Sequence, residues 1–281
     1  GVRSNDWRPS IIMVNGRTFE RSAPIQLFSW LSHRHGFGTY LHLVHGVLET
    51  ETFRESRKLR EKLIETIQRR ESHILVDTMV SPSLRSALAQ SLQMPGVSGM
   101  ENNTLLLEFM LSDPPERLAE LVESCQLAAV ARMNPLVLRH TPRFFGNRSE
   151  IHVWITWNDQ KNANLMVLLA YVLVGHPEWE NAEIRIFAAF PQDRVEVETT
   201  RLREMITLGR LPISAKNLKI IGTDADVDFD ALVEARSSLA DLVILGFTSE
   251  RLAERGPRIF LRHEYLAECL FVQARERILI E

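Results

Sequence analysis

The clearest pattern of apolar and polar positions lies over residues 150–190. Ile151–Trp157 is rich in β-branched and aromatic residues and predicts a buried strand. Lys161–Val174 lacks interior Gly and Pro and predicts a helix that ends at Gly175, and Ala182–Phe190 predicts a second strand. A strand, a helix and a strand at this spacing indicate a βαβ unit with parallel strands. Both strands are nearly continuously apolar, which indicates that helices cover both faces of the sheet.

The same helix decides whether the chain crosses a membrane. Its apolar part, Leu165–Val174, is the most apolar run in the chain. A membrane-spanning helix needs about twenty apolar residues, roughly twice this length. The N-terminus lacks the charged and then apolar pattern of a signal peptide. We therefore expect a soluble chain. Its first residue is Gly1 and not Met, so we expect either a cleaved chain or a piece of a longer protein.

Strands and helices alternate on both sides of this unit. Further strands are predicted at Arg8–Val14, Thr39–Leu48, Ile74–Val80, Thr104–Met110, Pro135–Arg139, Leu218–Ile221, Leu242–Gly246 and Arg277–Ile280. Further helices are predicted at Ala23–Arg34, Glu51–Arg70, Ser81–Leu92, Asp113–Ala131, Arg194–Leu208, Phe229–Leu239 and Arg262–Glu276, with Ser22 and Asp113 as caps.

A segment rich in Pro, Gly, Asn and Ser, Thr141–Ser149, separates the two halves of this alternation. We therefore expect two domains, 1–148 and 149–281. The predicted fold is α/β, with two tandem doubly wound, mainly parallel five-stranded sheets of the three-layer, Rossmann-like kind.

Composition narrows the function classes. The chain has 281 residues, of which 45% are hydrophobic and 25% are charged, and these fractions are ordinary for a globular protein. A net charge of -3 argues against a general nucleic-acid binder, which needs a basic face. Cys125 and Cys269 are the only cysteines, which argues against a disulfide framework and fits a reducing cytoplasm.

Glycine-rich phosphate loops are the first chemistry to test. The chain has no GxGxxG and no GxxxxGK[ST] motif. Gly96–Gly99 forms a GxxG, but it precedes a strand, whereas a phosphate loop follows one. Gly246 and Gly256 resemble part of the phosphate loop of universal stress proteins, but Val243 replaces its first glycine and Pro257 its hydroxyl residue. No cofactor is therefore predicted.

Metal binding has one apparent motif. Asp224, Asp226, Asp228 and Asp230 alternate as in a calcium loop, but the places for its Gly and Glu hold Phe229 and Ala235. Asp226 or Asp228 is instead predicted to cap a helix. His42 and His45 are predicted on opposite faces of a strand and so cannot share an ion.

The sequence also shows no set of residues that would support nucleophilic catalysis. The chain has no GxSxG motif, and its acids and bases are not grouped at a recognisable spacing. Cys125 lies among apolar residues and is predicted to pack in the core, and the same is predicted for Trp154 and Trp157. We therefore predict no catalytic, cofactor-binding or metal-binding residue and expect the chain not to be an enzyme.

Ordered segments along nearly the whole chain form a further pattern. They are Asp6-Trp7-Arg8-Pro9 with the following IIMVNG, Thr39–Arg54, Thr78–Thr104, Ile151–Leu169, Trp179–Phe187, Leu242–Leu245 and Ala274–Glu281. Together they resemble the C-terminal cytoplasmic domain of the cation-chloride cotransporters, the electroneutral sodium/potassium/chloride carriers. One departure is Asp159-Gln160-Lys161, which stands where the family has Asp-Gly-Gly. The long insertions of animal members are absent, which indicates a compact prokaryotic form.

This resemblance implies a non-catalytic regulatory module tethered to the cytoplasmic side of the cell membrane by a membrane domain of the same polypeptide. It implies halves like universal stress proteins, a homodimer, regulatory protein partners and a role in assembly, trafficking and ion symport. The alternative is a stand-alone nucleotide-binding protein of the universal stress type. Leu165–Val174 is apolar around much of its circumference, so part of it is expected either to meet a partner or to be covered by the first half of the chain.

Overall fold

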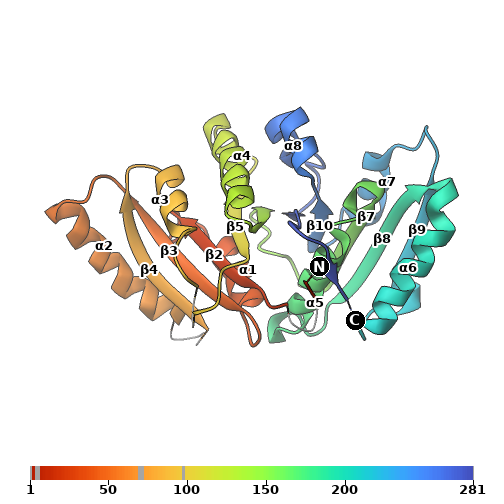
Figure 1. Cartoon of the computed structure of the whole chain (residues 1–281), viewed down its shortest axis with the longest axis horizontal. Helices are drawn as coiled ribbons and strands as arrows, with labels where there is room; N and C mark the ends of the chain where they lie inside the picture. Colours follow the sequence, from red (N-terminus) through yellow and green to blue (C-terminus); the bar gives the residue numbers. More distant parts are fainter. Residues whose placement is uncertain (1, 4–6, 69–72, 97–98, 281) are drawn as a thin grey trace. The chain divides into compact units, whose positions relative to one another are not determined.

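The chain forms two compact units. The computed structural model describes residues 2–3, 7–68, 73–96 and 99–280 (Figure 1). The N-terminal unit comprises Arg8–Phe109 and Asp113–Val137. The C-terminal unit comprises Leu138–Glu281, with Met110–Ser112 and the described residues of Gly1–Trp7. The chain thus enters the C-terminal unit for good at Leu138, whereas the sequence suggested a domain boundary after residue 148.

The sheet of the N-terminal unit has the strand order β4-β3-β2-β5-β6. Its strands are β2 (Ser10–Asn15), β3 (Phe37–His45), β4 (Ile74–Ser81), β5 (Thr104–Phe109) and β6 (Asn134–Arg139). Parallel pairs join β4 to β3, β3 to β2 and β2 to β5. The chain moves outward from β2 to β4 and then returns to the other side of β2. Open sheets bind ligands where the order reverses in this way, here between β2 and β5.

Helices cover this sheet (Figure 1). They are α1 (Ser22–Leu31), α2 (Thr50–Leu63), α3 (Leu84–Ser91) and α4 (Pro115–Val130). The predicted helix 51–70 continues past α2 as a π-helical turn at Ile64–Gln68, and its last two predicted residues lie outside the described ranges.

Two predicted helix caps are wrong. Ser22 is the first residue of α1, whose N-cap is Arg21. Pro114 and not Asp113 is the N-cap of α4, and the Asp113 carboxylate forms an ion pair with Arg21.

The sheet of the C-terminal unit has the same kind of order, β11-β10-β7-β8-β9, with every neighbouring pair parallel. Its strands are β7 (Glu150–Thr156), β8 (Glu183–Pro191), β9 (Leu218–Thr223), β10 (Leu242–Gly246) and β11 (Glu268–Val272). Its helices are α5 (Ala163–Val174), α6 (Val195–Leu208), α7 (Phe229–Ser237) and α8 (Ser249–Arg255). The short strands β1 (Val2–Arg3) and β12 (Ile278–Leu279) pair in parallel. In this sheet the order reverses between β7 and β10.

The predicted helix Arg262–Glu276 is wrong. The helix in this part of the chain is α8, which a 3₁₀ segment follows at Gly256–Leu261. The predicted range instead contains β11, which is buried along its whole length and pairs with β10 from Leu242↔Glu268 onward. Pairing and burial within the sheet therefore outweigh the local preference of the segment.

Two buried carboxylates fix the loop that the sequence marked as a boundary. Glu268 is fully buried and accepts hydrogen bonds from the backbone N–H groups of Thr141, at 2.8 Å, and Phe145, at 3.0 Å. Asp241 accepts hydrogen bonds from the backbone N–H groups of Ser149, at 2.7 Å, and Glu150, at 3.0 Å. This loop is therefore anchored within the C-terminal unit at both ends.

The apolar helix α5 lies in the core of the C-terminal unit. Leu165, Met166, Val167, Leu169 and Leu173 are fully buried, and the helix packs against β7, β8 and β10. Strands of its own unit therefore cover these side chains, whereas the sequence suggested cover by the first half of the chain or by a partner. Among the described residues, no helix combines the length and apolar character needed to cross a bilayer.

Candidate functional site

Charged side chains gather in the N-terminal unit where β5 ends. The Arg21 guanidinium contacts Glu108 Oε2 at 3.0 Å and also pairs with Asp113, and Arg117 lies 3.6 Å from Glu108 Oε1. Both carboxylate side chains are at most 4% exposed. Although burial alone lowers the pKa of Arg21, the hydrogen bond to Asp113 and the charge of Glu108 raise it above its ordinary value. These side chains therefore satisfy one another's charges.

Polar side chains beside this cluster are also paired with each other. The Thr18 hydroxyl lies 2.8 Å from the Tyr40 hydroxyl and 2.7 Å from His42 Nδ1. Burial raises the pKa of Tyr40 and lowers that of His42, so both side chains stay neutral at pH 7. His42 is buried and His45 is exposed, which agrees with their predicted placement on opposite faces.

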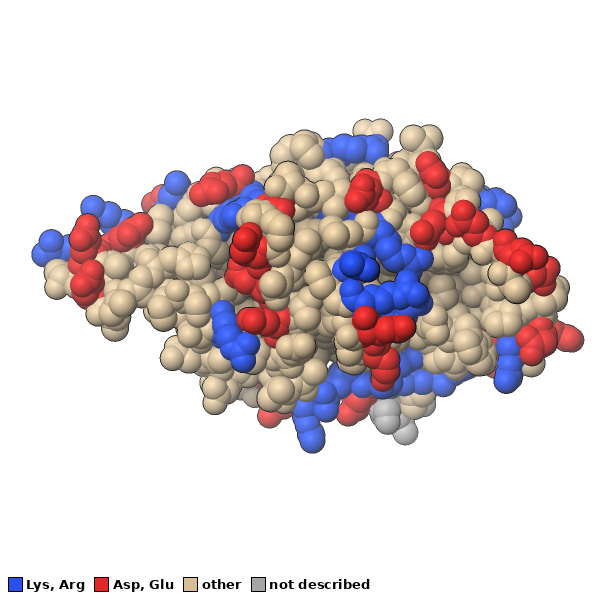
Figure 2. Space-filling view, turned by 90° about the horizontal axis from the view of Figure 1, so that it is seen from above, with Lys and Arg blue, Asp and Glu red and all other residues tan. Residues whose placement is uncertain are grey.

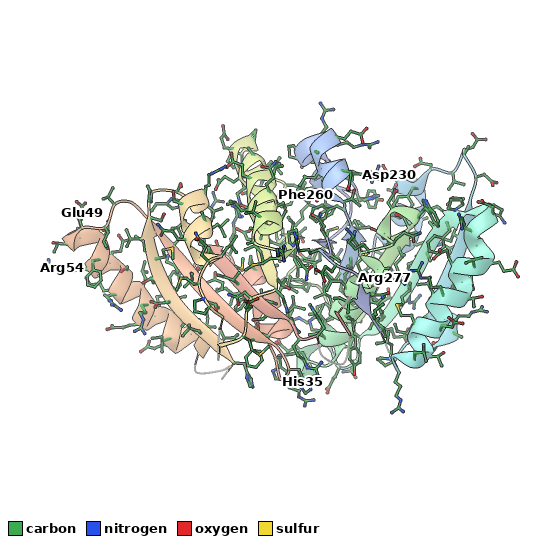
Figure 3. The ribbon with its side chains drawn as sticks, in the orientation of Figure 1. His35, Glu49, Arg54, Asp230, Phe260 and Arg277 are labelled. Atoms are coloured by element: carbon green, nitrogen blue, oxygen red, sulfur yellow. The ribbon has the colours of Figure 1, made fainter. Side chains whose placement is uncertain are left out.

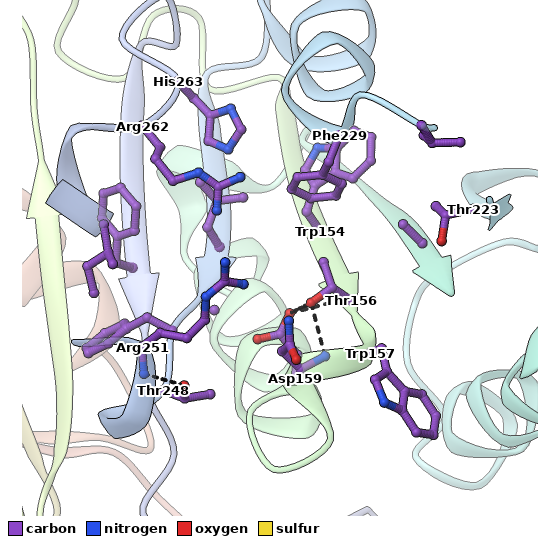
Figure 4. A pocket seen from close by; sticks show the side chains of 18 of the residues that line it. Trp154, Thr156, Trp157, Asp159, Thr223, Phe229, Thr248, Arg251, Arg262 and His263 are labelled. Carbon is purple, nitrogen blue, oxygen red and sulfur yellow. Dashed lines mark hydrogen bonds between the residues drawn. The ribbon is translucent and has the colours of Figure 1, made fainter. Parts of the chain in front are cut away.

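The C-terminal unit has a cavity of about 350 Å³ at the carboxyl ends of β7, β8, β9 and β10 (Figure 4). Its lining includes Thr156 and Asp159 after β7, Thr223 at the end of β9, Thr248 after β10, Phe229 of α7 and Arg262. This is the point where the strand order reverses, which is the usual ligand position in such a sheet. The cavity is the candidate site.

Asp159 forms the floor of the cavity and is 3% exposed. Its Oδ2 accepts hydrogen bonds from the backbone N–H and the hydroxyl of Thr156, each at 2.9 Å, and its Oδ1 accepts one from Asn162 at 3.2 Å. Burial raises the pKa of Asp159, while the hydrogen bonds from Thr156 and Asn162 oppose this shift. The carboxylate therefore closes the turn after β7.

Asn162 connects this floor to two other segments. Its Nδ2 donates to the carbonyl of Phe247 at 2.8 Å, and its Oδ1 accepts from the backbone N–H of Ala274 at 2.8 Å. The start of α5 is thereby tied to the residues that follow β10 and β11. The floor is thus a rigid part of the fold.

One wall of the cavity is aromatic. Trp154 is 1% exposed, stacks on Phe187 with ring centroids 4.6 Å apart, and meets Phe229 edge-on at 5.6 Å. Its Nε1 donates to the Ser237 hydroxyl at 2.8 Å. The predicted core position of Trp154 is confirmed. Trp157 is 37% exposed and lies under the guanidinium of Arg194, so its predicted core position is wrong.

The facing wall carries positive charge. The side chains of Arg251 and Arg262 point into the cavity from α8 and from the segment after the 3₁₀ helix (Figure 4). Arg262 Nη2 lies 2.7 Å from a carboxylate oxygen of Asp230, near the start of α7 (Figure 3). Burial and the charge of Arg262 lower the pKa of His263 to about 4, so its imidazole is neutral at pH 7.

Other predicted positions have structural roles. The Asp228 carboxylate accepts a hydrogen bond from Ala231 N–H at 3.2 Å and caps α7, as predicted. Cys125 is 3% exposed, as predicted, and burial raises its pKa to about 12. Gly256 follows α8 with φ +60, a backbone conformation that suits glycine. Of the Gly96–Gly99 motif, residues 97–98 lie outside the described ranges.

In the described part of the chain, no group of three or more His, Cys, Asp or Glu side chains is placed to hold a metal ion. The cavity itself was missed from the sequence. Its signal in the sequence is the recurrence of Arg in the segment after β10, where Arg251 and Arg262 line the cavity.

No family model matches this chain. Potassium/chloride cotransporter 3 of Caenorhabditis elegans is 29% identical over 154 residues, which are 53% of this chain and 14% of that protein's length. The chain therefore spans only a small part of this curated relative.

Solved structures match nearly the whole chain. The cytoplasmic domain of a prokaryotic cation chloride cotransporter matches with a TM-score of 0.66 and 16% identity over 96% of both chains. A universal stress protein from Archaeoglobus fulgidus matches with a TM-score of 0.52 and 10% identity over 94% of this chain and 96% of that one. A putative universal stress protein from Pseudomonas aeruginosa matches with a TM-score of 0.53 and 16% identity. The match covers 94% of this chain and 92% of that one. These likenesses confirm the predicted α/β fold, with halves like universal stress proteins.

Proposed function

We propose that this chain is the cytoplasmic domain of a cation-chloride cotransporter. The observation that carries the proposal is the match to the prokaryotic cotransporter domain, which covers 96% of both chains with a TM-score of 0.66. The matches to the universal stress proteins cover similar shares of both chains, but their TM-scores are only 0.53 and 0.52. The sequence match to a potassium/chloride cotransporter supports the same family independently of the structure.

In this proposal the domain regulates transport and catalyses no reaction. It lies on the cytoplasmic side of the cell membrane, is joined to the membrane domain of the same polypeptide, and moves no ions itself. The charged cluster of Arg21, Glu108 and Asp113 supports this role, because it fills the reversal point of the N-terminal sheet with paired side chains. Such a unit is suited to act as a scaffold.

The proposal is tested by the coding sequence that precedes Gly1 in the source genome. A cotransporter requires about twelve apolar segments of roughly twenty residues each in the same reading frame. A start codon directly before this segment, with no such spans in frame, would refute the proposal.

A homodimer is part of the same proposal. Because Leu169 is fully buried within its own unit, a Leu169→Glu substitution tests the core and not an interface. Sedimentation equilibrium of the unchanged chain is therefore the better experiment. The expected mass is twice that of the 32.2 kDa monomer at micromolar concentration, and a monomer at the highest soluble concentration would contradict the dimer.

The second candidate is a stand-alone nucleotide-binding protein of the universal stress type, which the cavity at the carboxyl ends of β7 and β10 favours. The Asp159 carboxylate counts against it, because it lies against Gly246, where a nucleotide phosphate would approach the backbone. Calorimetry with millimolar ATP decides: this candidate requires measurable heat of binding and a raised melting temperature.

A further inference from the structure

Arginine side chains gather on α8 and the 3₁₀ segment that follows it. Arg251 and Arg255 lie one helical turn apart on α8, and Arg258 and Arg262 lie within and directly after the 3₁₀ segment. Figure 2 shows basic side chains gathered in the middle of the face seen from above, with acidic side chains at their border. This local excess of positive charge contrasts with the net charge of -3 of the whole chain.

A surface hollow outside the cavity brings three of these arginines together. It has a volume of about 790 Å³ and is lined by Arg255, Arg258 and Arg262, whereas Arg251 lines the cavity and not the hollow. All but two of the described residues that line the hollow are charged. Pockets for small molecules are mainly apolar, so this hollow suits a larger ligand that carries charges of its own.

The two exposed arginines of the hollow have no partner in the described part of the chain. Arg255 and Arg258 form no ion pair or hydrogen bond there, whereas Arg262 lies 2.7 Å from a carboxylate oxygen of Asp230. A guanidinium presents several N–H donors in a planar fork, which matches the two oxygens of a carboxylate. The donors of Arg255 and Arg258 are therefore available to an acidic ligand.

The arginines also repel one another. Burial, and then the charges of Arg255 and Arg262, lower the pKa of the Arg251 guanidinium below its ordinary value, although the charge of Glu254 opposes this shift. Positive potential therefore remains over α8 and the segment after it. A negatively charged partner would relieve this repulsion.

Two acids in the hollow discriminate among negatively charged partners. Glu254 and Asp230 share its lining with the arginines. They repel a ligand whose charge is continuous, such as a nucleic-acid backbone or an anionic membrane surface. A peptide carries its charges at separate positions, and alternate side chains of an extended peptide lie about 7 Å apart. Its acidic residues can therefore face the arginines while its neutral residues pass Glu254 and Asp230.

We propose that the hollow lined by Arg255, Arg258 and Arg262 is a docking surface for an acidic, extended peptide segment of a partner protein. Carboxylates of the peptide bind the guanidinium forks of Arg255 and Arg258. Arg262 stays paired with Asp230 and holds the wall of the hollow in place. The peptide needs no phosphate and does not enter the cavity at the ends of β7 and β10. This inference rests on the C-terminal unit alone and on neither of the candidate functions above.

A short peptide in which Glu alternates with Ser is the probe. It carries a fluorescein label, and its binding to the full chain is measured by fluorescence anisotropy at low salt. The control peptide has Gln in place of every Glu. We expect the acidic peptide to bind, its affinity to fall as salt is added, and the control peptide not to bind.

Matched substitutions locate the bound peptide. Arg255→Gln combined with Arg258→Gln removes the two unpaired guanidinium groups of the hollow, and Arg203→Gln combined with Arg210→Gln removes an equal charge from exposed positions elsewhere in the unit. We expect the first pair to weaken binding at least about tenfold and the second pair to leave it within about twofold of the parent chain. Arg251→Gln alters the cavity and should weaken binding less than about threefold.

Three results would overturn the proposal. The first is that the acidic peptide does not bind while the parent chain is folded by circular dichroism, including the case in which the chain binds phosphatidylserine vesicles instead. The second is an equal loss in the two double variants, which would indicate attraction to net charge without a site. The third is a larger loss in Arg251→Gln than in the variant of Arg255 and Arg258, which would place the bound acid in the cavity. Thermal melts of all variants without peptide show whether a loss of binding comes from unfolding.

Discussion

The carboxylate of Asp159 lies directly against the α-carbon of Gly246. A Cβ atom added to Gly246 would lie only 1.8 Å from Asp159 Oδ1. The last residue of β10 must therefore lack a side chain if the turn after β7 is to keep its buried acid. This contact joins the ends of the two strands between which the order of the C-terminal sheet reverses.

Gly246→Ala is therefore expected to lower the free energy of unfolding by about 1–3 kcal/mol, since the added methyl group displaces a hydrogen-bonded carboxylate. Urea unfolding followed by circular dichroism measures the change. Gly16→Ala is the control, because its added Cβ would lie 3.4 Å from the nearest atom, His45 Nε2. Equal effects of the two substitutions would contradict the packing argument.

The charged cluster of the N-terminal unit gives a second prediction. Arg21→Ala leaves Glu108 and Asp113 buried without this partner, and we expect a loss of about 3 kcal/mol in the free energy of unfolding. Arg17→Ala is the control, because Arg17 also contacts Asp113 but has a 43% exposed side chain. Its expected loss is below about 1 kcal/mol. A loss for Arg21→Ala as small as that for Arg17→Ala would show that the cluster contributes little.

The anchored loop of residues 141–149 in the C-terminal unit gives a third prediction. Asp241→Ala removes the acceptor for the backbone N–H groups of Asn147, Ser149 and Glu150 and should lower stability by about 3 kcal/mol. Limited proteolysis of the folded protein should then show faster cleavage within 141–149. Asp193→Ala, at an exposed position, should leave the cleavage rate unchanged. Parent-like resistance of Asp241→Ala would show that other contacts hold the loop.

His263 gives a prediction about pH. Its pKa is about 4 in the folded chain, below the ordinary value of 6.5, because of burial and the charge of Arg262. The unfolded chain therefore takes up the proton first as the pH falls, and stability is lost between about pH 6.5 and pH 4. We expect this residue to account for about 1–2 kcal/mol of the loss, after allowance for partial solvent access.

Urea unfolding at about pH 7 and pH 4.5 measures that loss. His263→Gln should reduce the pH dependence of stability by the stated amount, whereas the exposed His35→Gln should leave it as in the parent chain (Figure 3). An unchanged pH dependence in His263→Gln would contradict the assignment.

Much of the fold follows from local pattern. Ile151–Trp157 and Ala182–Phe190 are β-branched, aromatic and apolar enough that no other element suits them, and β7 and β8 lie there within a residue at each end. β11 could not be predicted in this way. It begins with Glu268, which is tolerated in a buried strand only because Thr141 and Phe145 donate to its carboxylate from more than a hundred positions away.

The candidate site was hidden for a related reason. Arg251 and Arg262 come together with Asp159 only when α8 and the segment after it fold back over the ends of β7 and β10 (Figure 4). Because a helix was predicted at Arg262–Glu276, the sequence did not indicate that Arg262 lies at the ends of these strands. Trp157 was misjudged because it follows β7 and belongs to a 3₁₀ turn, where the alternation of strand faces no longer applies.

The central claim, that this chain serves a cation-chloride cotransporter, is tested most directly by ion flux. Cells that express the complete reading frame containing this segment are assayed for uptake of radioactive rubidium, a tracer for potassium, with sodium present. The account predicts uptake that requires external chloride and is lost when chloride is replaced by gluconate. Uptake that is indifferent to chloride, with the protein recovered in the soluble fraction of the lysate, would contradict it.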